Sequence, residues 1–329
     1  MSIRKATPFL VPDGFYQIKE MPFIGFKLFI ILLYFFLNSA INFLNRWSLG
    51  LYGFHFPLTV TLSHNVFAFI CIGAVIFARG GNIELLQLRS KKYWKSIVII
   101  GAFSAMNIGL NNSSLVHMEL SMNQIITASM PVFTCIFSLF LIPGYCPNLI
   151  QVMSIVPICL GVMLAIYEEA QIETLGIILC SIATLSNALR TALANRLLVE
   201  SLDAIELQWF VSPVSILVLI IPTIYLEFVE FSKYAMLNPF VTLNILLGGS
   251  VLALSYNICL FMLIKLFSGV TANILGNVKI ILIIFMSKVL LGEMKTVNAR
   301  LKGGTALTLG GFFFYNYGSL TNNRPSVKK

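Results

Sequence analysis

The stretch NILGNVKIILIIFMSKVLLGE, residues 273–293, is long and apolar enough to cross a membrane, yet it carries Lys279 near its centre. About 20 apolar residues in a helix that rises 1.5 Å per residue span the hydrocarbon of a bilayer. At that rise, about ten residues on either side place the ammonium too deep to reach the headgroups easily. The stretch therefore predicts a membrane helix whose central cation faces an anionic ligand or water.

The rest of the chain repeats this apolar pattern. It has 329 residues, of which 58% are hydrophobic and 11% are charged, and no charged or low-complexity segment is long enough to form an extramembrane domain. These features predict an all-α membrane protein with a single domain over residues 23–319, between tails at 1–22 and 320–329. We place ten transmembrane helices at residues 23–45, 57–77, 96–116, 121–142, 149–167, 174–195, 205–227, 240–264, 270–291 and 298–319.

Lysine and arginine residues outside these helices set the orientation, because cytosolic loops of membrane proteins are enriched in them. Thirteen lie on the side of the two termini and three on the other, so both termini are predicted to be cytosolic. The formal net charge of +9 is then mostly a signal for membrane topology, and we expect no nucleic-acid partner. The three on the far side are Arg46, Lys233 and Lys295.

Ten spans with both ends on one side favour an inverted repeat. Each half would have five helices, an odd number, so a duplicated half must be inverted relative to its copy. The repeats would cover about residues 23–167 and 174–319. Small residues in the first half of the fifth and tenth spans support this arrangement, although close helix packing alone also explains them.

The acidic residues argue against several classes of protein. None of the thirteen lies near the middle of a predicted span, whereas cation-coupled carriers and intramembrane proteases of the aspartyl or metal type need such groups. His64 next to Asn65 is more typical of a packing group than of a proton relay. The six cysteines show no metal-binding spacing. We therefore expect no enzyme, no metal and no cofactor.

The cations inside the predicted spans point to an anionic ligand. A lysine at the centre of a membrane helix costs about 2.5 to 3.5 kcal/mol, and no intramembrane acid of this chain neutralises Lys279. Gly276 and Asn277 lie within one turn of it and allow close approach and hydrogen bonding. Arg190 would add a guanidinium fork suited to phosphate, although snorkelling is an equal alternative for it. Tyr256 is the one tyrosine that we assign to the site.

Five segments carry a family resemblance over nearly the whole chain. Together they resemble the triose-phosphate-translocator branch of the drug/metabolite transporter superfamily, which includes plastid phosphate translocators and many nucleotide-sugar carriers. The segments are NRWSLGLYGFHFPLTVTLSH from Asn45, MNQIITASMPVFT from Met122, VPICLGVMLAIYEE from Val156, LSNALRTALANRLL from Leu185 and GNVKIILIIFMSKVLLGE from Gly276.

The resemblance implies ten helices in a five-plus-five inverted repeat, a central cavity, and exchange of one anionic substrate for another. It implies phosphate contact by Lys279, a matching arginine at Arg190 and a substrate-facing tyrosine at Tyr256. Two positions depart from the plastid phosphate translocators, which have a lysine where this chain has Thr127 and an arginine where it has Ile280. A site with fewer cations is more similar to those of the nucleotide-sugar carriers.

The resemblance thus favours an antiporter of the Golgi or endoplasmic reticulum that exchanges a nucleotide sugar for a nucleoside monophosphate. Lys279 and Arg190 would neutralise phosphate, and Gly276, Asn277, Tyr256, Thr127 and Gln124 would complete the site. The partners would be this phosphate-bearing molecule and the lipid bilayer, and a homodimer is allowed. Two alternatives stay open: an exchanger of sugar phosphate or phosphoenolpyruvate for phosphate in a plastid-type membrane, and a membrane scaffold or regulator that transports nothing.

Overall fold

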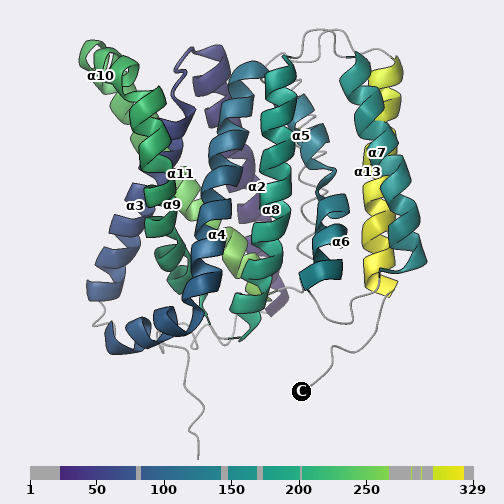
Figure 1. Cartoon of the computed structure of the whole chain (residues 1–329), viewed down its shortest axis with the longest axis horizontal. Helices are drawn as coiled ribbons and strands as arrows, with labels where there is room; N and C mark the ends of the chain where they lie inside the picture. The colour runs from purple at the N-terminus through teal and green to yellow at the C-terminus, as the bar shows by residue number, and fades with distance from the viewer. Residues whose placement is uncertain are drawn as a thin grey trace, which may run out of the picture.

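A computed structural model describes most of the chain as a bundle of helices that run up and down alongside one another (Figure 1). The described residues are 23–78, 83–141, 147–168, 173–200, 202–266, 283, 290 and 299–321. No strand occurs among them. The predicted ninth span, with Lys279, Asn277 and Gly276, lies outside the described residues apart from positions 283 and 290.

The helices follow the order of the predicted spans. They are α2 (Phe23–Arg46), the π-helix η1 (Trp47–Leu51), α3 (Pro57–Ala78), α4 (Ile83–His117), α5 (Leu120–Thr127), α6 (Met130–Leu141), α7 (Leu149–Glu168), α8 (Thr174–Glu200), α9 (Ala204–Leu226), α10 (Phe228–Leu237), α11 (Pro239–Leu266) and α13 (Ala299–Thr321).

Six helices in the described part of the chain are long and apolar enough to cross a membrane. They lie within α2 continued by η1, α3, α4, α8, α9 and α11, and α7 contains a shorter apolar stretch, Leu149–Leu164. The prediction of a multi-pass, all-helical membrane protein is therefore confirmed. The full number of ten spans and the inverted repeat stay predictions.

The predicted fourth span, residues 121–142, is divided in the structure. α5 ends at Thr127 and α6 begins at Met130, and between them the Ser129 amide donates to the Ile126 carbonyl over 3.0 Å, as in a tighter turn. Pro131 favours a break here, because it has no N–H to donate to the Thr127 carbonyl, although Pro157 and Pro213 lie within the continuous helices α7 and α9. The break places the end of α5 beside the central cavity described below.

Close helix pairs build the bundle. α7 and α13 lie side by side along their length, α4 packs on α8 and α9, and α11 packs on α2 and α3 (Figure 1). Glycine permits the closest of these approaches: a Cβ on Gly161 of α7 would lie 2.5 Å from the Thr308 nitrogen and 2.6 Å from the Gly304 oxygen. Small residues are the usual means by which helices approach this closely in lipid.

Aromatic side chains form a packed cluster at one end of the bundle. Phe54 and Phe56, in the segment that joins η1 to α3, pack edge-on at 5.1 Å between ring centroids. Phe231 and Tyr234 of α10 cover them, with centroids 5.4 Å apart for Phe54 and Tyr234 and 5.5 Å apart for Phe56 and Phe231. We call these four residues the aromatic plug.

Candidate functional site

A central cavity of about 240 Å³ lies among α2, α3, α4, α8 and α11. Asparagine and glutamine form the largest group of its lining side chains. They are Asn38, Asn42, Asn45, Asn65, Asn107, Asn111, Asn112, Gln124, Asn187, Gln208 and Asn257. An amide both donates and accepts hydrogen bonds, so such a wall suits a ligand rich in hydroxyl, carbonyl and ring nitrogen groups.

Hydrogen bonds between helices hold part of this wall in place. The Asn45 Nδ2 of α2 donates to the Asn112 Oδ1 of α4 over 3.0 Å, and the Asn112 Nδ2 donates to the Thr61 Oγ1 of α3 over 2.9 Å. All three side chains are buried. A polar network that is satisfied in this way fixes its side chains, because leaving a buried partner unpaired is costly.

A second set of bonds orients the residues predicted on α5. The Gln124 Nε2 donates to the Asn123 Oδ1 over 3.2 Å, which leaves the Gln124 Oε1 without a partner among the described residues. The Thr127 hydroxyl donates to the Asn123 carbonyl over 2.8 Å, so its oxygen retains lone pairs to accept another bond. Both side chains line the cavity and offer acceptors to a ligand.

Arg190 of α8 is the cation among the described lining residues. Its side chain is only 6% exposed, and its Cζ lies 5.8 Å from the centre of the Phe261 ring. The Nε has no hydrogen-bond partner in the described part of the protein, and the described lining residues include no carboxylate. A buried guanidinium without an acid beside it is suited to receive a ligand's negative charge.

Tyr256 of α11 forms the neighbouring wall. Its ring stacks on that of Tyr34 of α2, with centroids 5.9 Å apart and planes 26° apart. Both tyrosines line the cavity. The pair adds aromatic surface and two hydroxyl groups to the cavity wall, and both suit contacts with a nucleobase or a sugar.

The structure thus gathers four of the predicted site residues around one cavity: Arg190, Tyr256, Thr127 and Gln124. The other three, Lys279, Asn277 and Gly276, lie outside the described residues. His64 also lines the cavity and is buried, with its Nε2 lacking a hydrogen-bond partner among the described residues. A Cβ on Gly249 would lie 2.8 Å from that nitrogen, so the ring packs against a glycine of α11.

The asparagines of α2 and α4 were missed by the sequence analysis. Asn38, Asn42 and Asn45 recur at intervals of four and three residues, and Asn107 and Asn111 are four apart. Residues at these spacings share one face of a helix. A row of amides on one face of a predicted membrane helix was therefore a readable signal for a polar cavity.

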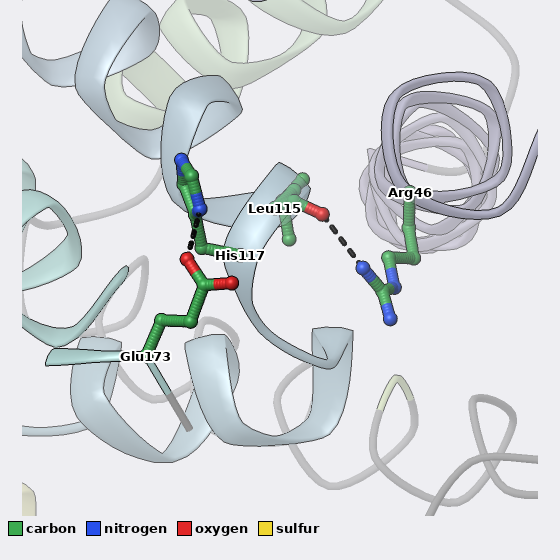
Figure 2. A network of polar contacts seen from close by, with 4 residues as sticks. All are labelled: Arg46, Leu115, His117 and Glu173. Carbon is green, nitrogen blue, oxygen red and sulfur yellow. Dashed lines mark hydrogen bonds and ion pairs between the residues drawn. The ribbon is translucent and has the colours of Figure 1, made fainter. Parts of the chain in front are cut away.

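Polar contacts tie the segments at the plugged end of the bundle (Figure 2). The Arg46 Nη1, at the end of α2, donates to the Leu115 carbonyl of α4 over 2.7 Å. His117 Nδ1, two residues further along, lies 2.6 Å from the Glu173 Oε2, just before α8. These contacts join three segments that are distant in sequence.

Glu227 adds a third polar tie at this end. Its carboxylate follows α9 and accepts bonds from the Leu58 and Thr59 amides, both over 2.8 Å, and from the Thr59 hydroxyl over 2.7 Å. It thereby caps the first turn of α3, whose amides have no partner within the helix. The aromatic plug packs against Val116, between Leu115 and His117, so it lies at the same end of the protein as these polar contacts.

We expect Glu227 to give the protein a specific pH response. Burial raises the pKa of its carboxyl above the ordinary 4.5, against the opposing hydrogen bonds from Thr59 and Leu58. Between the unfolded pKa and the raised folded pKa the folded state holds the proton more tightly, so stability falls as pH rises through that window. The melting temperature of the wild type should therefore fall relative to that of Glu227→Gln from about pH 4.5 upward. Parallel pH profiles for the two proteins would contradict this, and Glu230→Gln on α10 is the control expected to follow the wild type.

The family follows from a comparison with known proteins. The model described as the Triose-phosphate Transporter family matches residues 26–316. The chain belongs to this family. The match runs from the first described helix to the last and includes every described residue that lines the cavity.

Relatives in Arabidopsis thaliana have different named substrates. A "Probable sugar phosphate/phosphate translocator" is 28% identical over 293 residues, 87% of this chain and 81% of the relative. UDP-uronic acid transporter 1 is 28% identical over 285 residues, 84% of this chain and 90% of its own length. GDP-mannose transporter GONST5 is 28% identical over 287 residues, 85% of this chain and 82% of its own.

A solved crystal structure shares the fold. It superposes with a TM-score of 0.58 over 92% of this chain and 97% of its own, with 14% sequence identity. Transport by a multi-pass membrane protein is therefore the activity of this family, and the bundle around a polar cavity is its fold in this chain.

Proposed function

We propose that this protein is an antiporter that exchanges a nucleotide sugar for a nucleoside monophosphate across an endomembrane. The observation that carries the proposal is the composition of the cavity: many amides, two stacked tyrosines and Arg190 as the cation of its described wall. A nucleotide sugar has the matching parts, namely phosphates for the guanidinium and a base and sugar for the amides and rings. Lys279, Asn277 and Gly276 would complete the phosphate side.

The proposed architecture is a single transporter domain over residues 23–319, with ten spans, a five-plus-five inverted repeat and cytosolic termini. Its repeat would relate α2 to α8, α3 to α9, α4 to α11 and α7 to α13. The packing supports this, since α4 lies on α8 as α11 lies on α2, and α4 lies on α9 as α11 lies on α3. Two further close pairs, α3 with α9 and α7 with α13, would each be mapped onto themselves by this repeat.

Alternating access is the proposed mechanism. In this proposal the aromatic plug and the ties at Arg46 and Glu227 keep one end closed, and the charge distribution predicts that this end faces away from the cytosol. Opening that end requires these contacts to separate. An empty cavity keeps an uncompensated guanidinium, whereas bound phosphate neutralises it, so loaded protein should cross between states more readily than empty protein. That difference favours exchange over one-way transport.

Two alternatives have their own support. An exchanger of sugar phosphate or phosphoenolpyruvate for phosphate in a plastid-type membrane is favoured by the relatives that are named as phosphate translocators. It is less well matched to a wall so rich in amides and with Thr127 in place of a cation. The Golgi or endoplasmic reticulum remains our proposed location. A scaffold or regulator without transport is the alternative of another class.

Purified protein in liposomes separates these functions. Liposomes loaded with UMP or GMP should take up the matching nucleotide sugar, while liposomes loaded with phosphate should not. Uptake driven only by internal phosphate would replace the nucleotide-sugar assignment with the phosphate exchanger. No exchange, together with no thermal shift by any phosphate compound, would favour the scaffold.

A further inference from the structure

A second hollow lies on the outside of the bundle, where α4 passes α9. It has a volume of about 480 Å³ and is lined by Lys91, Trp94, Ile97, Val98 and Phe210. None of these residues is among the described residues that line the central cavity. We call it the α4–α9 groove.

One face of α4 supplies most of the groove. Four residues lie on a single face of this helix, because they are separated by three, one and three positions: Lys91, Trp94, Lys95 and Val98. Both lysines are exposed, and Trp94 is 56% exposed with the Lys95 Nζ 5.7 Å from its ring. Along this face the surface changes from cationic to aromatic to apolar.

The groove lies at the boundary of the membrane. The candidate span of α4 begins at Lys91, and Figure 1 shows the preceding turns of α4 running along the lower end of the bundle before the helix turns upward. Tryptophan favours the headgroup level of a bilayer, and lysines just outside it meet lipid phosphates. With Trp94 at that level, Ile97, Val98 and Phe210 would lie at the depth of the acyl chains.

No carboxylate is among the described residues that line the groove. Two acids lie at the start of α9: Asp203 precedes the helix and Glu206 lies one turn before Phe210. They form a capping box in which the Asp203 amide donates to the Glu206 Oε2 over 3.2 Å. Glu206 is fully buried, so it faces its own helix start. The exposed part of the groove is cationic.

We propose that the α4–α9 groove binds one anionic phospholipid. The phosphate lies beside Lys91 and Lys95, the glycerol region lies against Trp94, and an acyl chain follows Ile97, Val98 and Phe210. Two lysines select a lipid with net negative charge over a zwitterionic one, and the apolar floor selects a lipid over free phosphate. Because α4 also supplies Asn107 and Asn111 to the central cavity, the lipid would hold a helix of the transport site at its membrane boundary.

The test measures lipid retention and does not depend on the transported substrate. The purified full chain is titrated with phosphatidylserine or with phosphatidylcholine of the same acyl chains, and bound lipid is counted by native mass spectrometry. Wild type should retain phosphatidylserine preferentially, and Lys91→Gln with Lys95→Gln should lower that preference about tenfold. The matched control is Lys233→Gln with Lys302→Gln, which removes the same charge from exposed positions elsewhere and should keep the preference.

Further arms make each outcome decisive. Trp94→Ala should weaken retention of phosphatidylserine while leaving the lysines in place. If both double variants lost the preference for phosphatidylserine equally, the lipid would be attracted only by the net charge of the protein. That result would overturn the proposal of a binding groove. Binding of water-soluble glycerophosphoserine as tight as that of the whole lipid would also overturn it, because the apolar floor would then contribute nothing. Melting temperatures in phosphatidylcholine confirm that the variants are folded.

Discussion

Arg190→Gln is expected to lower exchange of the phosphate-bearing substrate about 100-fold while the empty protein keeps or gains thermal stability. A hydrogen bond to a charged group contributes about 1.5 to 3 kcal/mol, and about 1.4 kcal/mol corresponds to a factor of ten. In the empty cavity the same guanidinium is buried without a carboxylate among the described lining residues, so its removal relieves a desolvation cost. A substitution that lowers activity but raises stability is typical of a residue that serves ligand binding and not folding.

Uptake by loaded liposomes measures the first effect, and melting temperature with and without nucleotide measures the second. Arg190→Lys keeps the charge but loses the planar fork, so a loss of about tenfold is expected. Arg46→Gln is the matched control: this arginine is also buried, yet it donates to the Leu115 carbonyl. It should lower the melting temperature and preserve the nucleotide-induced shift. If the Arg190→Gln variant exchanged substrate as fast as the wild type, Arg190 would not be part of the substrate site.

The helices were predictable because a membrane span must be long and apolar, and hydropathy records both properties. The predicted starts at residues 23, 57, 149 and 174 coincide with those of α2, α3, α7 and α8, whereas other ends were missed. α4 begins at Ile83 and not near residue 96, since its first turns contain lysines, tyrosine and tryptophan that form a helix outside the hydrocarbon. The break before α6 was readable in principle from Pro131, but a proline within a span only marks where a break is allowed.

The candidate site was predictable where a residue is costly in lipid. Arg190 could be predicted because a cation within a membrane helix has a high free-energy cost that implies a function. An asparagine costs less, since its amide can form hydrogen bonds with a neighbouring helix. The Asn45 to Asn112 bond spans 67 residues and the Glu227 to Thr59 bond spans 168. Such contacts depend on which helices pack side by side, and a local sequence pattern does not determine this packing. The rows of asparagines on α2 and α4 were the local signals available for the amide wall.

Gly161→Leu is expected to cost about 3 kcal/mol of stability, the upper end for overpacking a filled interface. Gly161 lies where α7 meets α13, and a Cβ there would come within 2.6 Å of the Gly304 oxygen and 2.5 Å of the Thr308 nitrogen. Both atoms are backbone, so no rotation of a side chain relieves the overlap. The two helices must separate, which also loses the packing of Ile158 with Phe312 and Tyr315.

Gly310→Leu on α13 is the matched control, because a Cβ on Gly310 meets nothing within 4 Å. Glycine and leucine differ equally in helix propensity at both positions, so the control isolates the contact between helices. The melting temperature of the purified protein should fall for Gly161→Leu and stay near or above that of the wild type for Gly310→Leu. Equal changes would mean that propensity, and not the close approach of α7 and α13, determines the cost. An intermediate Gly161→Ala is expected to show most of the loss, since the overlap already begins at the Cβ.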